Sequence, residues 1–143
     1  MEIEAVRVPK AFQGFTLLHW AANNENLLDN ASALKALLRH KLDPRARDAN
    51  GATALHWAAW RGNREAAAAL AEAGAELNAR DFGGQTPLHL AVDARRLEMV
   101  EWLLAHHADP TIASRRDETP LELAQRLGFF EIVQALRSPA TKL

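Results

Sequence analysis

The residues of this chain best suited to acid–base or metal chemistry are its six histidines, because the sequence contains no cysteine. Three of them each follow a threonine by three residues, and the full set is His19, His40, His56, His89, His106 and His107. The one metal site that the sequence leaves open would use His106, His107 and Asp109. Adjacent residues on a helix point about 100° apart, however, so this pair is poorly placed to share an ion. We therefore expect no metal site.

Motifs that accompany catalysis are missing from the sequence. It contains no Gly-rich phosphate loop, no Gly-x-Ser-x-Gly elbow and no His-Glu-x-x-His pair, and without cysteine it has no thiolate nucleophile. The sequence therefore predicts no catalytic residue, no cofactor and no enzymatic activity.

The threonines that precede the histidines mark an internal repeat. Four short motifs align, and their threonines are separated by 37, 33 and 33 residues: Thr16-Leu17-Leu18-His19, Thr53-Ala54-Leu55-His56, Thr86-Pro87-Leu88-His89 and Thr119-Pro120-Leu121-Glu122. A glycine stands two residues before three of these threonines, and Asp117 takes its place in the fourth motif. A fixed period of this length predicts a repeat architecture.

The repeated motif resembles that of the ankyrin repeat, most clearly in Gly84-Gln85-Thr86-Pro87-Leu88-His89-Leu90-Ala91 and in the loop sequence from Ala73 to Asp81. The resemblance covers about residues 11–137. It implies an all-α solenoid of four helix-turn-helix repeats with projecting β-turn hairpins, at about 11–47, 48–80, 81–113 and 114–137, followed by a tail at 138–143. It also implies that the repeated histidine hydrogen-bonds to the backbone between neighbouring loops. The first repeat carries four extra residues, and the last departs at Asp117 and Glu122.

Each expected unit has the local signals of two short helices. Thr53 can cap a first helix, and Pro87 and Pro120 stand where a helix tolerates a missing N–H. Apolar stripes at three- and four-residue spacing predict the second helices: Ala33, Leu34, Leu37 and Leu38; Leu97, Met99, Val100, Leu103 and Leu104; Phe130, Ile132, Val133 and Leu136. Polar residues in the last unit, including Glu122, Gln125, Arg126, Gln134 and Arg137, predict a solvent-facing C-terminal cap. The insertion at 23–30 is either a tolerated loop or an enlarged contact loop.

The four tryptophans are expected to play two different roles. Trp20 and Trp57 share one repeat position, which favours packing between repeats, and Trp102 is also expected to pack. Trp60 differs, because its repeat equivalents are Asn23, Asp93 and Arg126, which predicts a solvent-facing position on the concave surface. Together with Arg61 it has the composition of a binding hot spot.

Further candidate contact residues lie at the expected hairpin tips and on the concave face. With Trp60 and Arg61, the predicted partner-binding set is Phe12, Phe15, Asn23, Asn24, Arg47, Asn50, Arg80, Phe82, Gln85, Asp93, Arg115, Arg116 and Arg126. An alternative for Phe12 and Phe15 is packing on the segment from Val6 to Val8. Arginines gather on hairpin and first-helix positions and glutamates on second helices, so a basic concave front and an acidic back are expected.

These features predict a module that binds another protein with an acidic or mixed surface. A narrower version is a dedicated inhibitor or immunity-type partner of an enzyme. The alternative is nucleic-acid binding through an arginine-lined groove, which the formal net charge of −1 disfavours. No stretch approaches the length of a transmembrane helix and the first ten residues do not resemble a signal peptide, so we expect a cytoplasmic protein. We also expect it to be a monomer on its own.

Overall fold

The computed structural model describes residues 16–23 and 30–138. Within these ranges the chain forms eight helices and no strand: α1 (Leu17–Asn23), α2 (Asn30–Arg39), α3 (Ala54–Arg61), α4 (Arg64–Glu72), α5 (Pro87–Asp93), α6 (Leu97–Ala105), α7 (Pro120–Leu127) and α8 (Phe130–Arg137). The expected all-α solenoid is confirmed.

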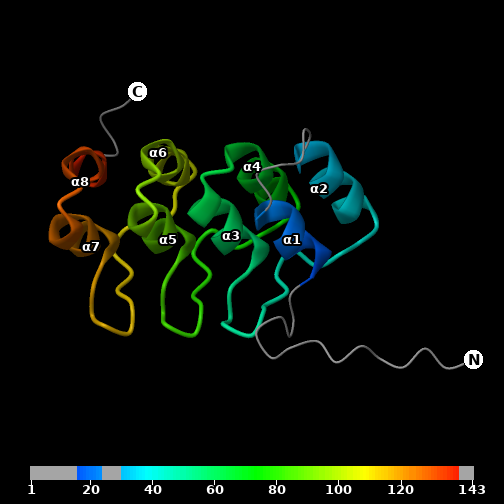
Figure 1. Ribbon diagram of the computed structural model, residues 1–143, viewed down its shortest axis with the longest axis horizontal. Helices are drawn as coiled ribbons and strands as arrows, with labels where there is room; N and C mark the ends of the chain where they lie inside the picture. The colour runs from blue at the N-terminus through cyan, green and yellow to red at the C-terminus, as the bar shows by residue number, and fades with distance from the viewer. Residues whose placement is uncertain (1–15, 24–29, 139–143) are drawn as a thin grey trace, which may run out of the picture.

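The helices stand in two rows, with loops projecting to one side (Figure 1). The first helices α1, α3, α5 and α7 pack in sequence, α2 packs on α4, and α6 packs on α8. Each first helix also packs against the second helix that follows it. Most side chains of the core therefore lie between the rows and between successive helix pairs.

Threonine and proline begin the first helices as the sequence predicts. Thr53, Thr86 and Thr119 are extended N-cap residues whose hydroxyl oxygens accept the backbone N–H three residues later. Pro87 and Pro120 are the first residues of α5 and α7, where no intrahelical N–H bond is lost. The prediction that Thr53 caps a helix is thus confirmed.

Small and branched apolar residues fill the space between the helices. Alanines on the first helices, including Ala58, Ala59, Ala91 and Ala124, are fully buried and allow close helix approach. The second helices contribute larger side chains such as Leu34, Leu70, Met99, Leu103 and Ile132, which are also inaccessible to solvent or nearly so. This packing gives neighbouring pairs one continuous core.

One residue of the apolar stripes predicted for the second helices is not buried. Phe130, expected on the buried face of α8, is 71% exposed. It is the first residue of α8, and the preceding Phe129 occupies the inward position against the core instead. No helix among the described residues combines the length and apolar character needed to cross a bilayer.

Candidate protein-binding surface

The projecting loops of the second and third repeats are tight hairpins, each organised by its first residue. In the second repeat the N–H of Asp48 donates to the carbonyl of Ala52 at 2.9 Å, and the Asp48 Oδ1 accepts the N–H groups of Asn50 and Ala52. Asp81 makes the same set of bonds with Gln85 and Gly83 in the third repeat. The hairpins are therefore held by their own hydrogen bonds.

Successive hairpins are also joined to each other at their tips. The N–H of Phe82 donates to the carbonyl of Asn50 at 3.0 Å, and one repeat further the N–H of Arg115 donates to Gly83 at 2.9 Å. The ring of Phe82 lies so close to Gly51 that an added Cβ there would be 2.6 Å from it. Gly51 has a φ of 76°, so both its conformation and this close approach require glycine.

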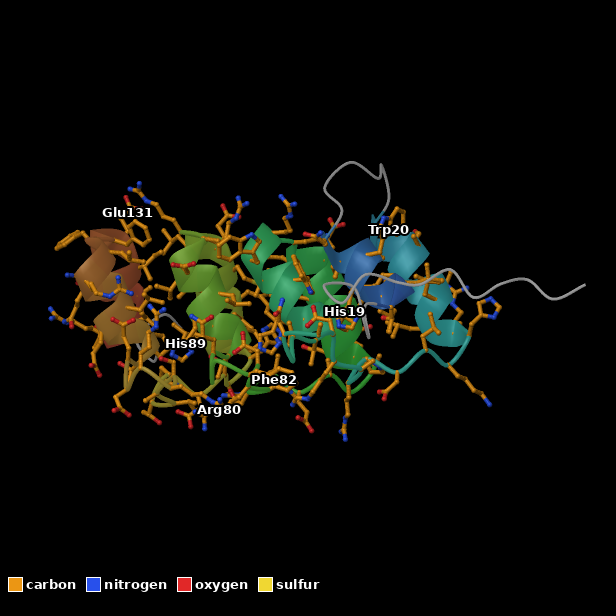
Figure 2. All side chains as sticks on the ribbon, turned by 60° about the horizontal axis from the view of Figure 1, so that its bottom comes forward. His19, Trp20, Arg80, Phe82, His89 and Glu131 are labelled. Carbon is orange, nitrogen blue, oxygen red and sulfur yellow. The ribbon has the colours of Figure 1, made fainter. Side chains whose placement is uncertain are left out.

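Two arginines extend this connection with their side chains. The Arg47 guanidinium donates to the carbonyl of Gly51 in its own hairpin and to that of Arg80 in the next repeat. Arg80 repeats the pattern, donating to Gly84 at 3.3 Å and to Ala113 at 3.0 Å. Both side chains remain exposed, as Figure 2 shows for Arg80, while Nη1 of Arg47 and Nε and Nη2 of Arg80 make these bonds to the hairpin carbonyls.

The repeated histidines form a second connection, deeper in the molecule. Nε2 of His19 lies 2.8 Å from the carbonyl oxygen of Ala52, that of His56 lies 3.0 Å from Gln85, and that of His89 lies 2.9 Å from Glu118. Each histidine thus reaches the hairpin of the following repeat, and Figure 2 shows His19 and His89 in the region between the helices and the hairpins. The expected hydrogen bond between neighbouring loops is confirmed.

The partners of these histidines determine their protonation. At each site Nδ1 accepts the backbone N–H of the threonine three residues earlier at 3.1 Å, so Nδ1 is unprotonated and Nε2 carries the proton that is donated to the carbonyl. Burial lowers the pKa of all three imidazoles below the ordinary 6.5, and the bond to the carbonyl only partly opposes it. His19, His56 and His89 therefore form a row of neutral histidines, the histidine ladder, which connects successive repeats.

The fourth repeat replaces this histidine with Glu122. The Thr119 hydroxyl donates to Glu122 Oε1 at 3.0 Å and accepts the Glu122 N–H. Both bonds lie at the start of α7 and do not connect it to another repeat. Glu122 is exposed, as are the other polar residues of the predicted cap, Gln125, Arg126, Gln134 and Arg137. The polar outer side is as expected, apart from Phe130.

Trp60 lies at the end of α3 with 38% of its surface exposed, which confirms its expected exposure. Arg61 donates from Nε to Asn23 Oδ1 at 2.8 Å, which links α3 to α1. Asp93, the equivalent of Trp60 on α5, is exposed as well. The structure thus brings Asn23, Trp60 and Arg61 together on neighbouring first helices.

The expectation for Trp20 is wrong. Trp57 is half-buried, and its indole N–H donates to Asp48 Oδ2 at 2.9 Å, but its equivalent Trp20 is 47% exposed. The sequence position that corresponds to Asp48 is occupied by Ala11, which has no carboxylate to accept such a bond. Trp20 and the 59% exposed Leu17 therefore add apolar surface to α1 that the sequence argument missed.

The remaining predicted contact residues are distributed along the hairpins. Phe82 is 56% exposed, and Asn50, Arg115 and Arg116 are also exposed. The backbone carbonyl of Gln85 is taken by His56. Three predicted residues, Phe12, Phe15 and Asn24, lie outside the described part of the chain.

The Arg126 side chain forms an ion pair within its own repeat. Its Nε and Nη2 donate to the two carboxylate oxygens of Glu118 at 2.7 and 3.0 Å, a bidentate arrangement. The hydrogen bond from Arg126 holds the pKa of Glu118 below its usual value. Among the arginines of the expected basic front, the charge of Arg126 is offset by the Glu118 carboxylate, whereas Arg47 and Arg80 donate to neutral carbonyl oxygens and keep their charge.

The metal site that the sequence left open would have used His106, His107 and Asp109. His106 stacks on Trp102, with ring centroids 4.0 Å apart, and its Nδ1 lies 2.8 Å from the Trp102 carbonyl. Trp102 itself is half-buried against the core, as expected. Residues 16–23 and 30–138 contain no cluster of three or more His, Asp or Glu side chains suited to a metal ion.

Two family profiles match the chain. One, described as ankyrin repeats in three copies, matches residues 3–81, and the other, described as ankyrin repeats in many copies, matches residues 70–124. Together they extend through the hairpins and the histidine ladder described above. A search of curated proteins found no matching relative.

Proposed function

This chain belongs to the ankyrin-repeat family, whose repeats are generally protein–protein interaction modules without catalytic activity, and on that premise we propose that it binds a partner protein through its first helices and hairpin tips. The partner presents an apolar patch together with acidic groups. The narrower role that we propose is that of a dedicated inhibitor or immunity-type partner of an enzyme, acting as a cytoplasmic monomer.

The observation that carries the proposal is a set of exposed aromatic side chains on three consecutive repeats. Trp20 on α1, Trp60 on α3 and Phe82 at the third hairpin are 47%, 38% and 56% exposed. Tryptophan is enriched among residues that dominate binding energy. The hydrogen-bonded hairpins hold Phe82 in place before any partner arrives.

The basic part of the proposed surface lies mainly at the fourth hairpin. Arg115 and Arg116 are exposed, and no hydrogen bond or salt bridge of their guanidinium groups joins them to the described residues. Exposed guanidinium groups suit forked contacts with carboxylates. We therefore place the acidic contacts of the partner near these two residues and its apolar contacts near Trp60 and Trp20.

The test uses the chain as bait in a lysate of the organism that encodes it, with captured proteins quantified by mass spectrometry. Proteins retained by the wild type should be lost on baits that carry Trp60→Ala or the pair Arg115→Glu and Arg116→Glu. For a purified partner, Trp60→Ala should weaken binding by about thirtyfold or more, as for a hot-spot tryptophan. If the three baits capture the same proteins in equal amounts, the surface is assigned wrongly.

We do not extend the proposal to nucleic acids. Three of the arginines that would line such a groove donate to carbonyl or carboxylate oxygens of the chain itself, namely Arg47, Arg80 and Arg126. Tight binding of an arbitrary DNA duplex, with affinity that falls steeply as salt rises, would favour the nucleic-acid alternative.

A further inference from the structure

The end of the molecule formed by α1 and α2 exposes positions that the other repeats bury. Leu17, the first residue of α1, is 59% exposed, whereas its equivalents Ala54, Pro87 and Pro120 are buried. Each of these three residues begins a first helix that packs on the first helix of the preceding repeat. In the described part of the chain no helix precedes α1, so Leu17 lies in solvent.

The same comparison holds for α2, which packs on α1. Positions in α2 differ by 33 from their equivalents in α4, because the insertion at 23–30 comes before them. Ala36 is exposed and Leu37 is half-buried, whereas their equivalents Ala69 and Leu70 are buried. The apolar residues exposed in whole or in part at this end define the end face: Leu17, Trp20, Ala36 and Leu37.

The opposite end of the stack is polar. Figure 1 shows α1 and α2 at one end of the molecule and α7 and α8 at the other. The exposed residues of α7 and α8 include Glu122, Gln125 and Gln134. A terminal repeat needs a polar outer face, because no further repeat covers it. The first repeat departs from this rule and keeps the apolar residues of an internal repeat.

The charge beside the end face is basic. The charged residues of α1 and α2 are Lys35 and Arg39, and both are exposed. Arg39 lies three residues after Ala36 and therefore on the same side of α2. Glu25 and Asp29 of the insertion lie outside the described residues. A second copy stacked on this face would bring two sets of these cations together, so an acidic occupant is favoured over another copy of the chain.

The end face continues toward the surface already proposed for the partner. Asn23, the last residue of α1, lies three residues after Trp20, and its Oδ1 accepts a hydrogen bond from Nε of Arg61 at 2.8 Å. Arg61 directly follows the exposed Trp60. A partner that contacts Trp60 is therefore close to the end face.

We infer that the end face docks an amphipathic helix of the partner protein, which lies on α1 and α2 as the helices of a preceding repeat would. Its apolar residues contact Leu17, Trp20 and Ala36, and its acidic residues lie beside Arg39. Amphipathic helices commonly bind apolar surfaces in this way, and the small side chain of Ala36 allows close approach. The inference rests on the proposed function and deepens it, because it specifies that Trp20 meets a helix.

The probe for this site is a synthetic helical peptide of leucine and glutamate, added to the ¹⁵N-labelled full chain. We expect shifts to concentrate at the amides of Leu17, Ala36 and Leu37 and at the indole N–H of Trp20. The same peptide with lysine in place of glutamate should bind at least tenfold more weakly. Trp20→Ser should weaken binding by about tenfold or more, since it removes an apolar anchor. Leu17→Ser, at a still more exposed position, repeats the test with less risk to the fold.

Matched variants at the opposite end separate this face from general attraction. Arg39 and Arg137 are the exposed last residues of α2 and α8. Arg39→Glu should weaken peptide binding several-fold, whereas Arg137→Glu should change it by less than about twofold. Equal effects of the two charge reversals, or unaltered binding by both Trp20→Ser and Leu17→Ser, would overturn the inference.

Other occupants of the end face give different results. Removal of residues 1–10 should change peptide affinity by less than about twofold, and a larger gain would assign the face to the chain's own first residues and overturn the inference. Shifts at Leu17 that depend on protein concentration without peptide would assign it to a second copy, with the same consequence. Trp60→Ala should leave peptide binding unchanged, so partner capture and peptide binding test the proposed function and this inference separately.

Discussion

We expect the histidine ladder to make the stability of this protein depend on pH below about 7. Nδ1 of His19, His56 and His89 each accepts a backbone N–H, and Nε2 donates to the next hairpin, so protonation at Nδ1 would place two N–H groups against each other. Burial lowers their pKa values below 6.5. We therefore expect the native state to resist protonation in this range while the unfolded chain accepts it.

The sign and size of the effect follow from proton linkage. Well above pH 6.5 these histidines are neutral in both states, so their contribution to stability is fully present. As pH falls below 6.5 toward the lowered native pKa values, the unfolded state binds more protons and the free energy of unfolding decreases. Each histidine contributes a slope of up to about 1.4 kcal/mol per pH unit, so three give about 4 kcal/mol per pH unit. Ordinary carboxylates titrate near pH 4, largely outside this window.

The assay is urea denaturation at several pH values between 7.5 and 5, with the variant His56→Gln as a test of one position. Glutamine keeps a donor for the Gln85 carbonyl but cannot reproduce the Nδ1 acceptor for Thr53. We expect a loss of about 1 to 2 kcal/mol at pH 7.5 and a slope reduced by about one third. A free energy of unfolding that stays constant from pH 7 to 5, or an unchanged slope in His56→Gln, would refute the reasoning.

Two further substitutions test the local geometry by denaturation. Asp117 has a φ of 55°, and the equivalent Gly84 has a φ of 74°. Asp117→Gly should therefore stabilise the fold by about 0.5 to 1 kcal/mol, and a destabilised variant would contradict this. Gly84→Ala should destabilise the fold, because the new Cβ would be 2.8 Å from the backbone nitrogen of Arg115. Trp57→Phe removes the donor to the buried Asp48 Oδ2 and should cost about 1 to 3 kcal/mol, against about 0.5 kcal/mol or less for Trp60→Phe. Equal costs for the two tryptophans would show that the Asp48 bond contributes little.

Sequence alone predicted the helices and hairpins well, because the signals that determine them are local. The threonine caps, the prolines at the first helical position and the repeated histidine each act within a few residues or at a fixed period. Asp117 in place of the repeated glycine was also visible, and its positive φ shows that the hairpin keeps its shape despite the substitution.

The side-chain partners of the candidate site could not be predicted in the same way. An arginine at a hairpin can point to solvent or turn back, and only the positions of the carbonyls in the next repeat show that Arg47 and Arg80 turn back. For Trp20, recurrence at the position of Trp57 suggested packing, but Trp57 is held by the Asp48 carboxylate, and the position equivalent to Asp48 in the first repeat is Ala11.

Successive hairpins are connected both by the repeated histidines and by Arg47 and Arg80, and these connections bear on the proposed partner surface. Arginine remains charged throughout the physiological range, so the connections made by Arg47 and Arg80 do not depend on a group that titrates there. Rigid placement of contact residues reduces the entropy lost on binding, by about 0.5 to 1.5 kcal/mol for each side chain that need not be ordered. Phe82 benefits most directly, since its backbone N–H and its ring are both held on the preceding hairpin. In the proposed binding mode, Arg47 and Arg80 would therefore support Phe82 through the hairpins to which they donate.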